Sequence, residues 1–280
     1  MKKILLSAAF CLTVLGMVWG QAPKTVKDYV DIGMDYLESD NDRAIEAFTA
    51  AIKIDPTYAD AYIFRSVSYY LLGDFNKAMN DANQAIKLEP DNEYYYYVRG
   101  DIYRGNNEPE KAIAEYTQAL KLDPDNLGTY FARGNTYFDK GDYDRAIDDF
   151  SQMIKLNPKN GDGYYFRGNS YLMKEDYKKA IADYTQRIKL DPDFVLGYCN
   201  RGYSYFKVKD YNKALADFNK AIQLDPSQSL LFENRGEVYY KKKDYNRAIA
   251  DLEEALRLDP GNETAAKLLP EVRQAQGGKK

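Results

Sequence analysis

Histidine is absent from this sequence of 280 residues. Its absence removes the side chain that most often acts as a general base, a zinc ligand or a pH switch near neutrality. Phosphate-binding loops are missing too: no Gly-x-x-x-x-Gly-Lys-Ser/Thr string occurs, and Gly161-Asp162-Gly163 has no third glycine at the required spacing. The sequence therefore predicts a protein that is not an enzyme and that holds no metal and no cofactor.

Positive charge is not in excess, because 39 Lys and Arg residues face 43 Asp and Glu residues and the net charge is -4. A protein that follows a nucleic-acid backbone needs a clustered positive surface, so we expect no nucleic acid among its partners. Cysteine is also scarce, with only Cys11 and Cys199. Once Cys11 leaves with an N-terminal signal, the single remaining thiol cannot form an internal disulfide, and stability has to come from packing.

Long apolar runs are limited to one, from Ile4 to Val18, which follows Lys2 and Lys3 and precedes Trp19-Gly20-Gln21. A basic start, a short apolar stretch and small residues at a cleavage point predict a secretory signal peptide over residues 1–20. An uncleaved N-terminal anchor is the alternative, although the run is short for a membrane span. We therefore predict an exported protein, periplasmic or envelope-associated in a diderm bacterium, without a stable membrane span after cleavage.

A repeat dominates the rest of the sequence. A proline, usually preceded by Asp, returns every 34 residues, and two apolar stripes with helical spacing recur between successive prolines. A fixed period of this length indicates a solenoid, in which units stack because none of them can bury its apolar face alone. The prolines are Pro56, Pro90, Pro124, Pro158, Pro192, Pro226 and Pro260.

Three further columns appear when the proline is counted as position 32 of a 34-residue unit. Position 8 is Ser66, Gly100, Gly134, Gly168, Gly202 and Gly236; position 11 is Tyr69, Tyr103, Tyr137, Tyr171, Tyr205 and Tyr239; position 20 is Ala78, Ala112, Ala146, Ala180, Ala214 and Ala248. With these columns, residues from about 26 to 262 resemble the tetratricopeptide repeat (TPR) family.

The resemblance implies an all-α fold, namely an α-solenoid that winds as a right-handed superhelix of helix-turn-helix repeats. We place the seven TPR repeats at 26–58, 59–92, 93–126, 127–160, 161–194, 195–228 and 229–262. A short N-terminal segment, 21–25, precedes them. A capping helix, 263–276, and a disordered tail, 277–280, follow them. Pro270 is awkward in the middle of that helix, and we expect it to kink there.

Arginine occupies position 7 of all six full copies, where the family usually has Leu. These side chains fall on the core stripe, so each needs a carboxylate partner, or its burial would cost several kcal/mol. Position 23 supplies one in every full copy, whereas the first copy lacks both members and has Ile32 and Ala47. We predict a ladder of ion pairs within repeats: Arg65 with Asp81, Arg99 with Glu115, Arg133 with Asp149, Arg167 with Asp183, Arg201 with Asp217, and Arg235 with Asp251.

In this family the first helices line a concave face, where positions 2, 5, 9 and 12 usually meet the ligand. The resemblance therefore implies a partner-binding wall that is aromatic and aliphatic in the middle and acidic toward its end. Exposed apolar surface of this extent marks an interaction site, unless the rings pack against the next repeat. At positions 5, 9 and 12 the wall comprises Ile63, Val67, Tyr70, Tyr97, Asp101, Arg104, Phe131, Asn135, Phe138, Tyr165, Asn169, Leu172, Cys199, Tyr203, Phe206, Glu233, Glu237 and Tyr240.

Two classes of ligand suit this wall. A partner protein or peptide segment would be anchored by the aromatic side chains and hydrogen-bonded by Asn135 and Asn169. A glycan or peptidoglycan strand would stack on Tyr97, Phe131 and Tyr165. No Lys stands at position 5, so the Lys-and-Asn clamp by which some family members hold a terminal carboxylate is not expected. We favour a scaffold or adaptor that binds a protein, and a basic or hydrophobic partner suits the acidic end. The oligomeric state stays open.

Overall fold

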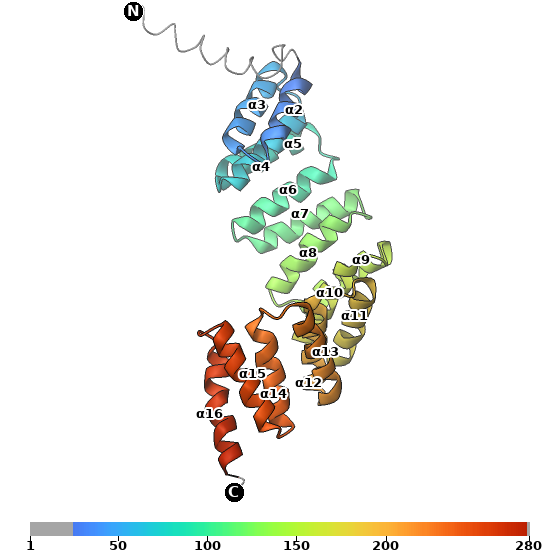
Figure 1. Cartoon of the computed structure of the whole chain (residues 1–280). Helices are drawn as coiled ribbons and strands as arrows, with labels where there is room; N and C mark the ends of the chain where they lie inside the picture. Colours follow the sequence, from blue (N-terminus) through green and yellow to red (C-terminus); the bar gives the residue numbers. More distant parts are fainter. Residues whose placement is uncertain (1–24, 279–280) are drawn as a thin grey trace, which may run out of the picture. The chain divides into compact units, whose positions relative to one another are not determined.

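Regular structure is α-helical throughout the computed structural model, which describes residues 25–278. The predicted signal peptide, most of the segment 21–25 and residues 279–280 lie outside the described residues. In the described part, fifteen helices follow one another as helix-turn-helix pairs (Figure 1). The predicted all-α class and solenoid architecture are therefore confirmed for this part of the chain.

Seven helix pairs and one further helix make up the described residues. The first helices of the pairs are α2 (Val26–Tyr36), α4 (Ala59–Leu71), α6 (Glu93–Gly105), α8 (Leu127–Asp139), α10 (Gly161–Met173), α12 (Val195–Lys207) and α14 (Ser229–Lys241). The second helices are α3 (Asn41–Ile54), α5 (Phe75–Leu88), α7 (Pro109–Leu122), α9 (Tyr143–Leu156), α11 (Tyr177–Leu190), α13 (Tyr211–Leu224) and α15 (Tyr245–Leu258). The last helix is α16 (Glu263–Gly277).

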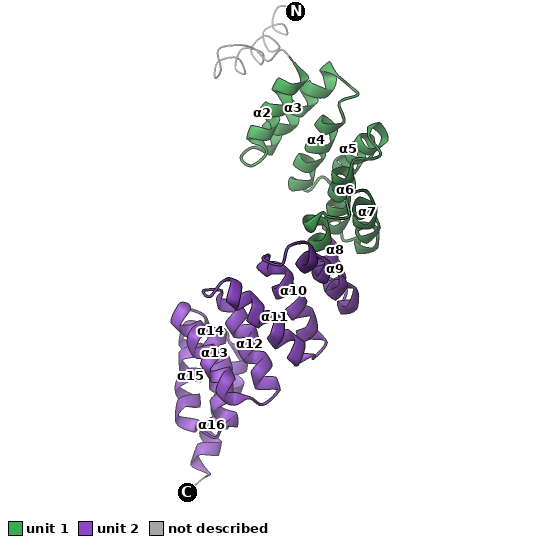
Figure 2. Ribbon diagram, turned by 90° about the vertical axis from the view of Figure 1, so that its right-hand side faces the viewer, with its two compact units in different colours: residues 1–132 green, residues 133–280 purple. Residues whose placement is uncertain are grey.

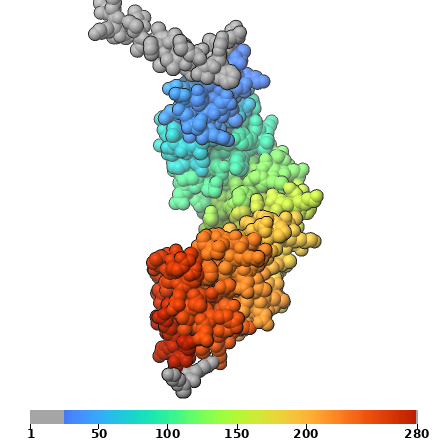
Figure 3. Space-filling view, in the orientation of Figure 1, coloured from blue at the N-terminus to red at the C-terminus, as the bar shows by residue number. Residues whose placement is uncertain are grey.

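The chain forms two compact units, and the boundary between them in the sequence falls inside α8, after Ala132 (Figure 2). Within each unit, the second helix of one pair packs against the first helix of the next pair, as α3 does on α4 and α11 on α12. Successive repeats therefore form successive layers in each unit, which follow the colour order in Figure 3. This nearest-neighbour packing is what a solenoid requires.

Each second helix of the full copies begins after a tight turn whose geometry recurs. At the N-cap of five of these helices, an aspartate accepts the backbone N–H three residues on, as Asp74 does from Lys77 at 3.1 Å. The third repeat has Glu108 at this place, and its side chain accepts no cap hydrogen bond. The residue before the cap has a positive φ, and it is glycine only at Gly73 and Gly141. Four non-glycine residues adopt the same conformation: Asn107, Glu175, Lys209 and Lys243. Backbone hydrogen bonds that close the first helix, such as Asp74 N to Tyr69 O at 2.9 Å, impose it.

The small residue at position 8 lets the two helices of a repeat approach closely. A Cβ atom placed on Gly100 would lie 2.6 Å from the ring of Tyr116, and one on Gly134 would lie 2.8 Å from the ring of Phe150. In the second repeat the larger of the two residues is at position 8, because Ser66 replaces glycine there and position 24 is Ala82. The hydroxyl of Ser66 donates to Ala78 O at 2.7 Å. Positions 8 and 24 therefore fill one shared volume in each repeat.

The last helix covers the end of the second unit. Ala265, Leu269 and Val272 of α16 are buried in one cluster with Tyr239, Leu252 and Ala255 of the seventh repeat. The helix continues through Pro270, whose ring lies on the exposed side, where water can satisfy the freed carbonyl group. It ends at Gly277, so the first residue of the predicted tail is helical.

Candidate functional site

The arginines at position 7 pair with carboxylates inside the repeats. Their side chains are only 16–21% exposed, and Nε and Nη2 of each donate to the carboxylate sixteen residues further on, at 2.7–3.0 Å. The observed pairs are Arg65–Asp81, Arg99–Glu115, Arg133–Asp149, Arg167–Asp183, Arg201–Asp217 and Arg235–Asp251. This bidentate geometry satisfies a guanidinium group well and leaves little of it for a ligand.

The third guanidinium nitrogen makes a contact that the sequence did not suggest. Nη1 of Arg65 donates to Thr49 Oγ1 at 3.0 Å, and Nη1 of Arg235 donates to Asn219 Oδ1 at 2.7 Å. The acceptor lies on the second helix of the preceding repeat, and Arg99, Arg167 and Arg201 reach their own preceding repeats in the same way. Each of these arginines therefore joins its own repeat to the one before it.

We call the side chains at positions 2, 5, 9 and 12 of the first helices the first-helix stripe. Two of its predicted partner-binding residues are wrong, because Ile63 is fully buried and Cys199 is only 4% exposed. Ile63 packs in one cluster with Tyr95, and Cys199 in one cluster with Leu231, so the first helix of the next repeat covers both side chains. Burial also raises the pKa of the Cys199 thiol to about 11.

The other predicted stripe residues keep some exposure. Arg104 is exposed, and the remainder are half-buried: Val67, Tyr70, Tyr97, Asp101, Phe131, Asn135, Phe138, Tyr165, Asn169, Leu172, Tyr203, Phe206, Glu233, Glu237 and Tyr240. The first-helix stripe therefore combines side chains that pack between repeats with others that water, or a ligand, can reach.

In the first unit the stripe is organised around Asp101. Its Oδ1 accepts the hydroxyl of Tyr116 at 2.7 Å and Nη2 of Arg104 at 3.2 Å. Tyr97 lies beside this group, and its ring stacks on that of Tyr94 with centroids 6.2 Å apart. Burial, reinforced by the Asp101 charge, raises the pKa of Tyr97 to about 12, so the phenol stays neutral. The result is an aromatic platform next to a carboxylate that already has partners.

In the second unit the same geometry recurs around Asn169. Its Oδ1 accepts the hydroxyl of Tyr184 at 2.8 Å and Nδ2 of Asn200 at 3.0 Å. Because the oxygen is occupied twice, the amide nitrogen is the group that Asn169 can offer to a ligand. The ring of Tyr165, one helical turn earlier, packs edge-on against Phe194 with centroids 5.1 Å apart.

Near the C-terminal end of the second unit the stripe is acidic and apolar. Glu233 accepts Nδ2 of Asn262 at 2.8 Å. Burial raises the pKa of Glu237, against the opposing charges of Lys241 and Lys207 and with help from Glu233. On the first helices of the last two repeats, Leu196 and Leu230 are 46% and 52% exposed. Both stand at position 2, a column that the expected wall left out although the spacing of the stripe includes it.

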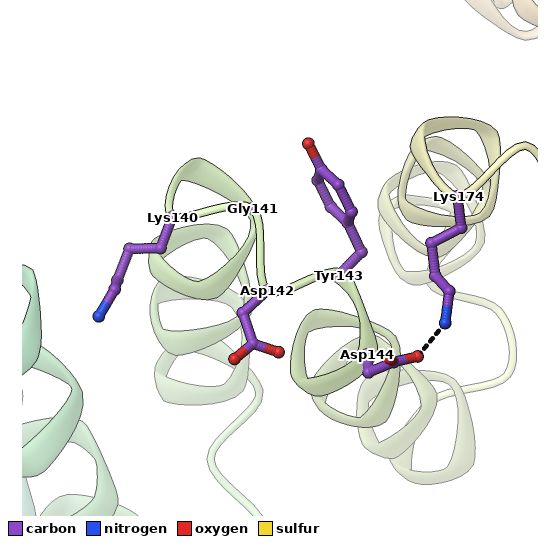
Figure 4. Close-up of a pocket in the computed structure, with 6 residues that line it drawn as sticks. All are labelled: Lys140, Gly141, Asp142, Tyr143, Asp144 and Lys174. Atoms are coloured by element: carbon purple, nitrogen blue, oxygen red, sulfur yellow. Dashed lines mark hydrogen bonds and ion pairs between the residues drawn. The ribbon is translucent and has the colours of Figure 1, made fainter.

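Two surface crevices lie in turns within repeats, and none of the residues that line them belongs to the stripe. One of about 350 Å³ is lined by the turn Lys140 to Asp144 and by Lys174, whose ammonium pairs with Asp144 (Figure 4). Another, of about 420 Å³, is lined by the turn Lys242 to Asn246 and by Gln276, at the same repeat positions. Their recurrence shows that they arise from the stacking of turns.

Residues 25–278 contain no cluster of acidic residues and cysteine that could hold a metal ion. Over the same residues, every helix is too short or too polar to serve as a membrane span.

Comparison with protein families gives matches along most of the sequence. Models described as tetratricopeptide repeat match residues 36–102, 129–160, 195–228 and 229–262. A model described as TPR repeat matches residues 100–141 and 168–209. No curated protein matches the sequence.

Solved structures with the same architecture are numerous. YrrB, described as a TPR protein with an unusual peptide-binding site, is 25% identical with a TM-score of 0.58, over 67% of this chain and 96% of that chain. MamA is 27% identical with a TM-score of 0.55, over 60% of this chain and 96% of that chain. The C-terminal part of a TPR repeat-containing protein from Cytophaga hutchinsonii has a TM-score of 0.73 at 22% identity, over 84% of this chain and 97% of that chain, and shows the fold alone.

Proposed function

Because the chain belongs to the tetratricopeptide repeat family, whose fold is that of protein-binding scaffolds, we propose that it is an exported, non-enzymatic adaptor. In this proposal it binds a segment of a partner protein along the first-helix stripe. One observation carries the proposal. The stripe contains large apolar side chains that remain 40–52% exposed, namely Tyr94, Leu196 and Leu230.

The chemistry of the stripe suits a peptide segment. Exposed leucines and tyrosines provide anchor sites for apolar side chains, and the amide nitrogen of Asn169 can donate to a peptide carbonyl group. YrrB, which shares the architecture, is described as having a peptide-binding site. A glycan ligand would instead stack a sugar ring on the aromatic platform of Tyr94 and Tyr97. The pull-down therefore has to distinguish a glycan ligand from a protein ligand.

Export is part of the proposal and is supported by the N-terminal sequence pattern alone. Lys2 and Lys3, the following apolar run and the small residues before Gln21 are typical of a secretory signal. The expected product of cleavage begins at Gln21. N-terminal sequencing of the protein from a periplasmic extract of the native host tests this part: a product that retains Met1 would contradict cleavage.

The binding part is tested by a pull-down from envelope extract with two double variants. Leu196→Ser with Leu230→Ser removes the two exposed leucines from the stripe. Leu190→Ser with Val208→Ser is the matched control, since these side chains are 41% and 42% exposed but lie at the ends of helices outside the stripe.

We expect the stripe variant to capture its proteins at least about tenfold less well, while the control behaves like the wild type. Equal capture by the two variants would refute binding along the stripe. Unchanged protein capture together with lost retention on a peptidoglycan column would favour a glycan ligand.

A further inference from the structure

Arg187 is the exception in a column of small or apolar residues. Position 27 of the repeat is Ala51, Ala85, Ala119, Met153, Ala221 and Ala255 in the other copies. The Arg187 side chain is only 12% exposed. Room for it comes from Gly161, at the start of α10, because a Cβ atom there would lie 2.8 Å from Cδ of Arg187. The fifth repeat therefore accommodates a large cation where other copies have a methyl group or a thioether.

The partners of this cation are few. Its guanidinium carbon lies 3.8 Å from the centroid of the Phe194 ring. Nη1 donates to Asp191 Oδ2 at 3.2 Å, whereas Nε is buried and has no hydrogen-bond partner among the described residues. Asp191 is not dedicated to Arg187, because its other oxygen accepts the backbone N–H of Asp193, as Asp225 accepts that of Ser227 in the next repeat.

The ladder arginines show what this guanidinium group lacks. In Arg167 of the same repeat, Nε and Nη2 hold the two oxygens of Asp183, both at 2.8 Å. In Arg187, Nε on that edge is without a partner among the described residues. A buried cation with so few hydrogen bonds destabilises a fold, and Ala would avoid the cost. Stability therefore does not explain the choice of Arg at this position.

The neighbours of Arg187 lead to the first-helix stripe of the second unit. The guanidinium group of Arg187 lies over the Phe194 ring, which also makes a T-shaped contact with the ring of Tyr165. Tyr165 in turn packs against Tyr184, with ring centroids 6.3 Å apart, and the hydroxyl of Tyr184 orients Asn169. Through these contacts, Arg187 of α11 and Phe194 at the N-cap of α12 adjoin Tyr165 and Asn169 of the stripe. The group combines a cation with unused donors, an apolar wall of two rings and an amide nitrogen.

We propose that Arg187, Phe194, Tyr165 and Asn169 form a carboxylate-binding site for a partner segment. The ligand is an acidic group next to an apolar residue, and it comes from an Asp or Glu side chain or from the free C-terminus of the partner. The site deepens the proposed function and rests on it. The carboxylate takes the Nε–Nη2 edge of Arg187, which a rotation of the flexible side chain presents to the ligand, and the apolar residue lies against Tyr165.

The experiment is a selection from two libraries of random dodecapeptides on the full protein without its signal. One library presents free C-termini, and the other is fused to its carrier through the C-terminus. The same selection is run on Arg187→Met. Met is a matched replacement, because Met153 occupies this position in the preceding repeat. Urea unfolding of both proteins serves as the second readout.

We expect the wild type to enrich peptides that place Asp, Glu or a free C-terminus beside an apolar residue, and Arg187→Met to lose this enrichment. A selected peptide should bind Arg187→Met about thirtyfold more weakly, and its amide analogue should bind both proteins alike. The unfolding midpoint of Arg187→Met should equal or exceed that of the wild type.

Enrichment in the free-terminus library alone identifies a C-terminal carboxylate as the ligand, whereas enrichment in both libraries identifies acidic side chains. The proposal is overturned if peptides are enriched without an acidic group, if Arg187→Met selects the same acidic peptides, or if it unfolds at clearly lower urea. Enrichment of no peptide from either library would instead count against peptide binding by the stripe as a whole.

Discussion

At the scale of the residue, buried charge in this protein serves two different purposes. The ladder arginines have both carboxylate oxygens and, in most repeats, a side chain of the preceding repeat as partners. Such a network fixes the register of the helices and costs little, provided that it is complete. Arg187 has an incomplete network at the same depth, which is why we assign it to a ligand.

The cost of an incomplete ladder pair can be measured in the sixth repeat. Arg201→Ile leaves the carboxylate of Asp217, which is 8% exposed, without its partner. We expect it to lower the free energy of unfolding by about 3 kcal/mol. The double variant Arg201→Ile with Asp217→Ala copies Ile32 and Ala47 of the first repeat and should recover most of that loss. Urea unfolding of both variants measures the difference, and a double variant no more stable than the single one would contradict a paired role.

The raised pKa of Glu237 leads to a prediction about how stability depends on pH. Its pKa is raised above the unfolded value, mainly by burial, so the folded chain holds this proton more tightly. Stability is therefore lost as pH rises from the unfolded pKa, about 4.3, through the raised folded pKa. At pH 7, Glu237→Gln should therefore unfold at higher urea than the wild type. The gain in free energy of unfolding should be less than about 1 kcal/mol, because the carboxyl group is partly solvated.

The higher stability of Glu237→Gln should disappear below pH 4, where Glu237 of the wild type is protonated and therefore as neutral as glutamine. Glu254→Gln is a control of opposite sign, because Arg257 lowers the pKa of the exposed Glu254. An advantage of Glu237→Gln that is the same at pH 3 and pH 7 would show that packing, and not charge, is responsible.

At the scale of the element, the two helices of a repeat are matched in size where they cross. Phe150 lies against Gly134, whereas Ser66 coexists with Ala82 in the second repeat. Gly134→Ser should therefore destabilise the protein by about 2 kcal/mol, because a rigid ring stands 2.8 Å from the new Cβ atom. In a Phe150→Ala background, which is itself less stable, the same serine should cost almost nothing. A double-mutant cycle of urea unfolding measures this coupling, and additive effects would contradict it.

The elements also show what could be predicted from the sequence and what could not. Helix positions recur in all seven copies and the ladder in six, so shared columns of the sequence reveal both. The burial of Ile63 and Cys199 was missed because it depends on Tyr95 and Leu231 of the next repeat, which no single column displays. Arg187 was missed for the opposite reason: its signal is a departure from the alanine column at position 27.

At the scale of the whole molecule, each repeat depends on its neighbours because apolar faces are buried mainly between successive helices. The consequence is a stability that is local along the sequence. Damage at one end should spread over one or two repeats and then stop, unlike the all-or-none response of a small globular domain.

Removal of the last helix tests this locality. A truncated protein that ends at Asn262 loses α16 and uncovers Leu252 and Ala255 of the seventh repeat, whereas one that ends at Gln276 keeps the helix and is the control. We expect backbone amides of α14 and α15 to exchange hydrogen at least about tenfold faster in the shorter protein, with α4 and α5 unchanged. Hydrogen-exchange mass spectrometry resolves these segments. Faster exchange of similar size in α4 and α5 would mean that the protein unfolds as one cooperative body, and the nearest-neighbour account of its stability would then fail.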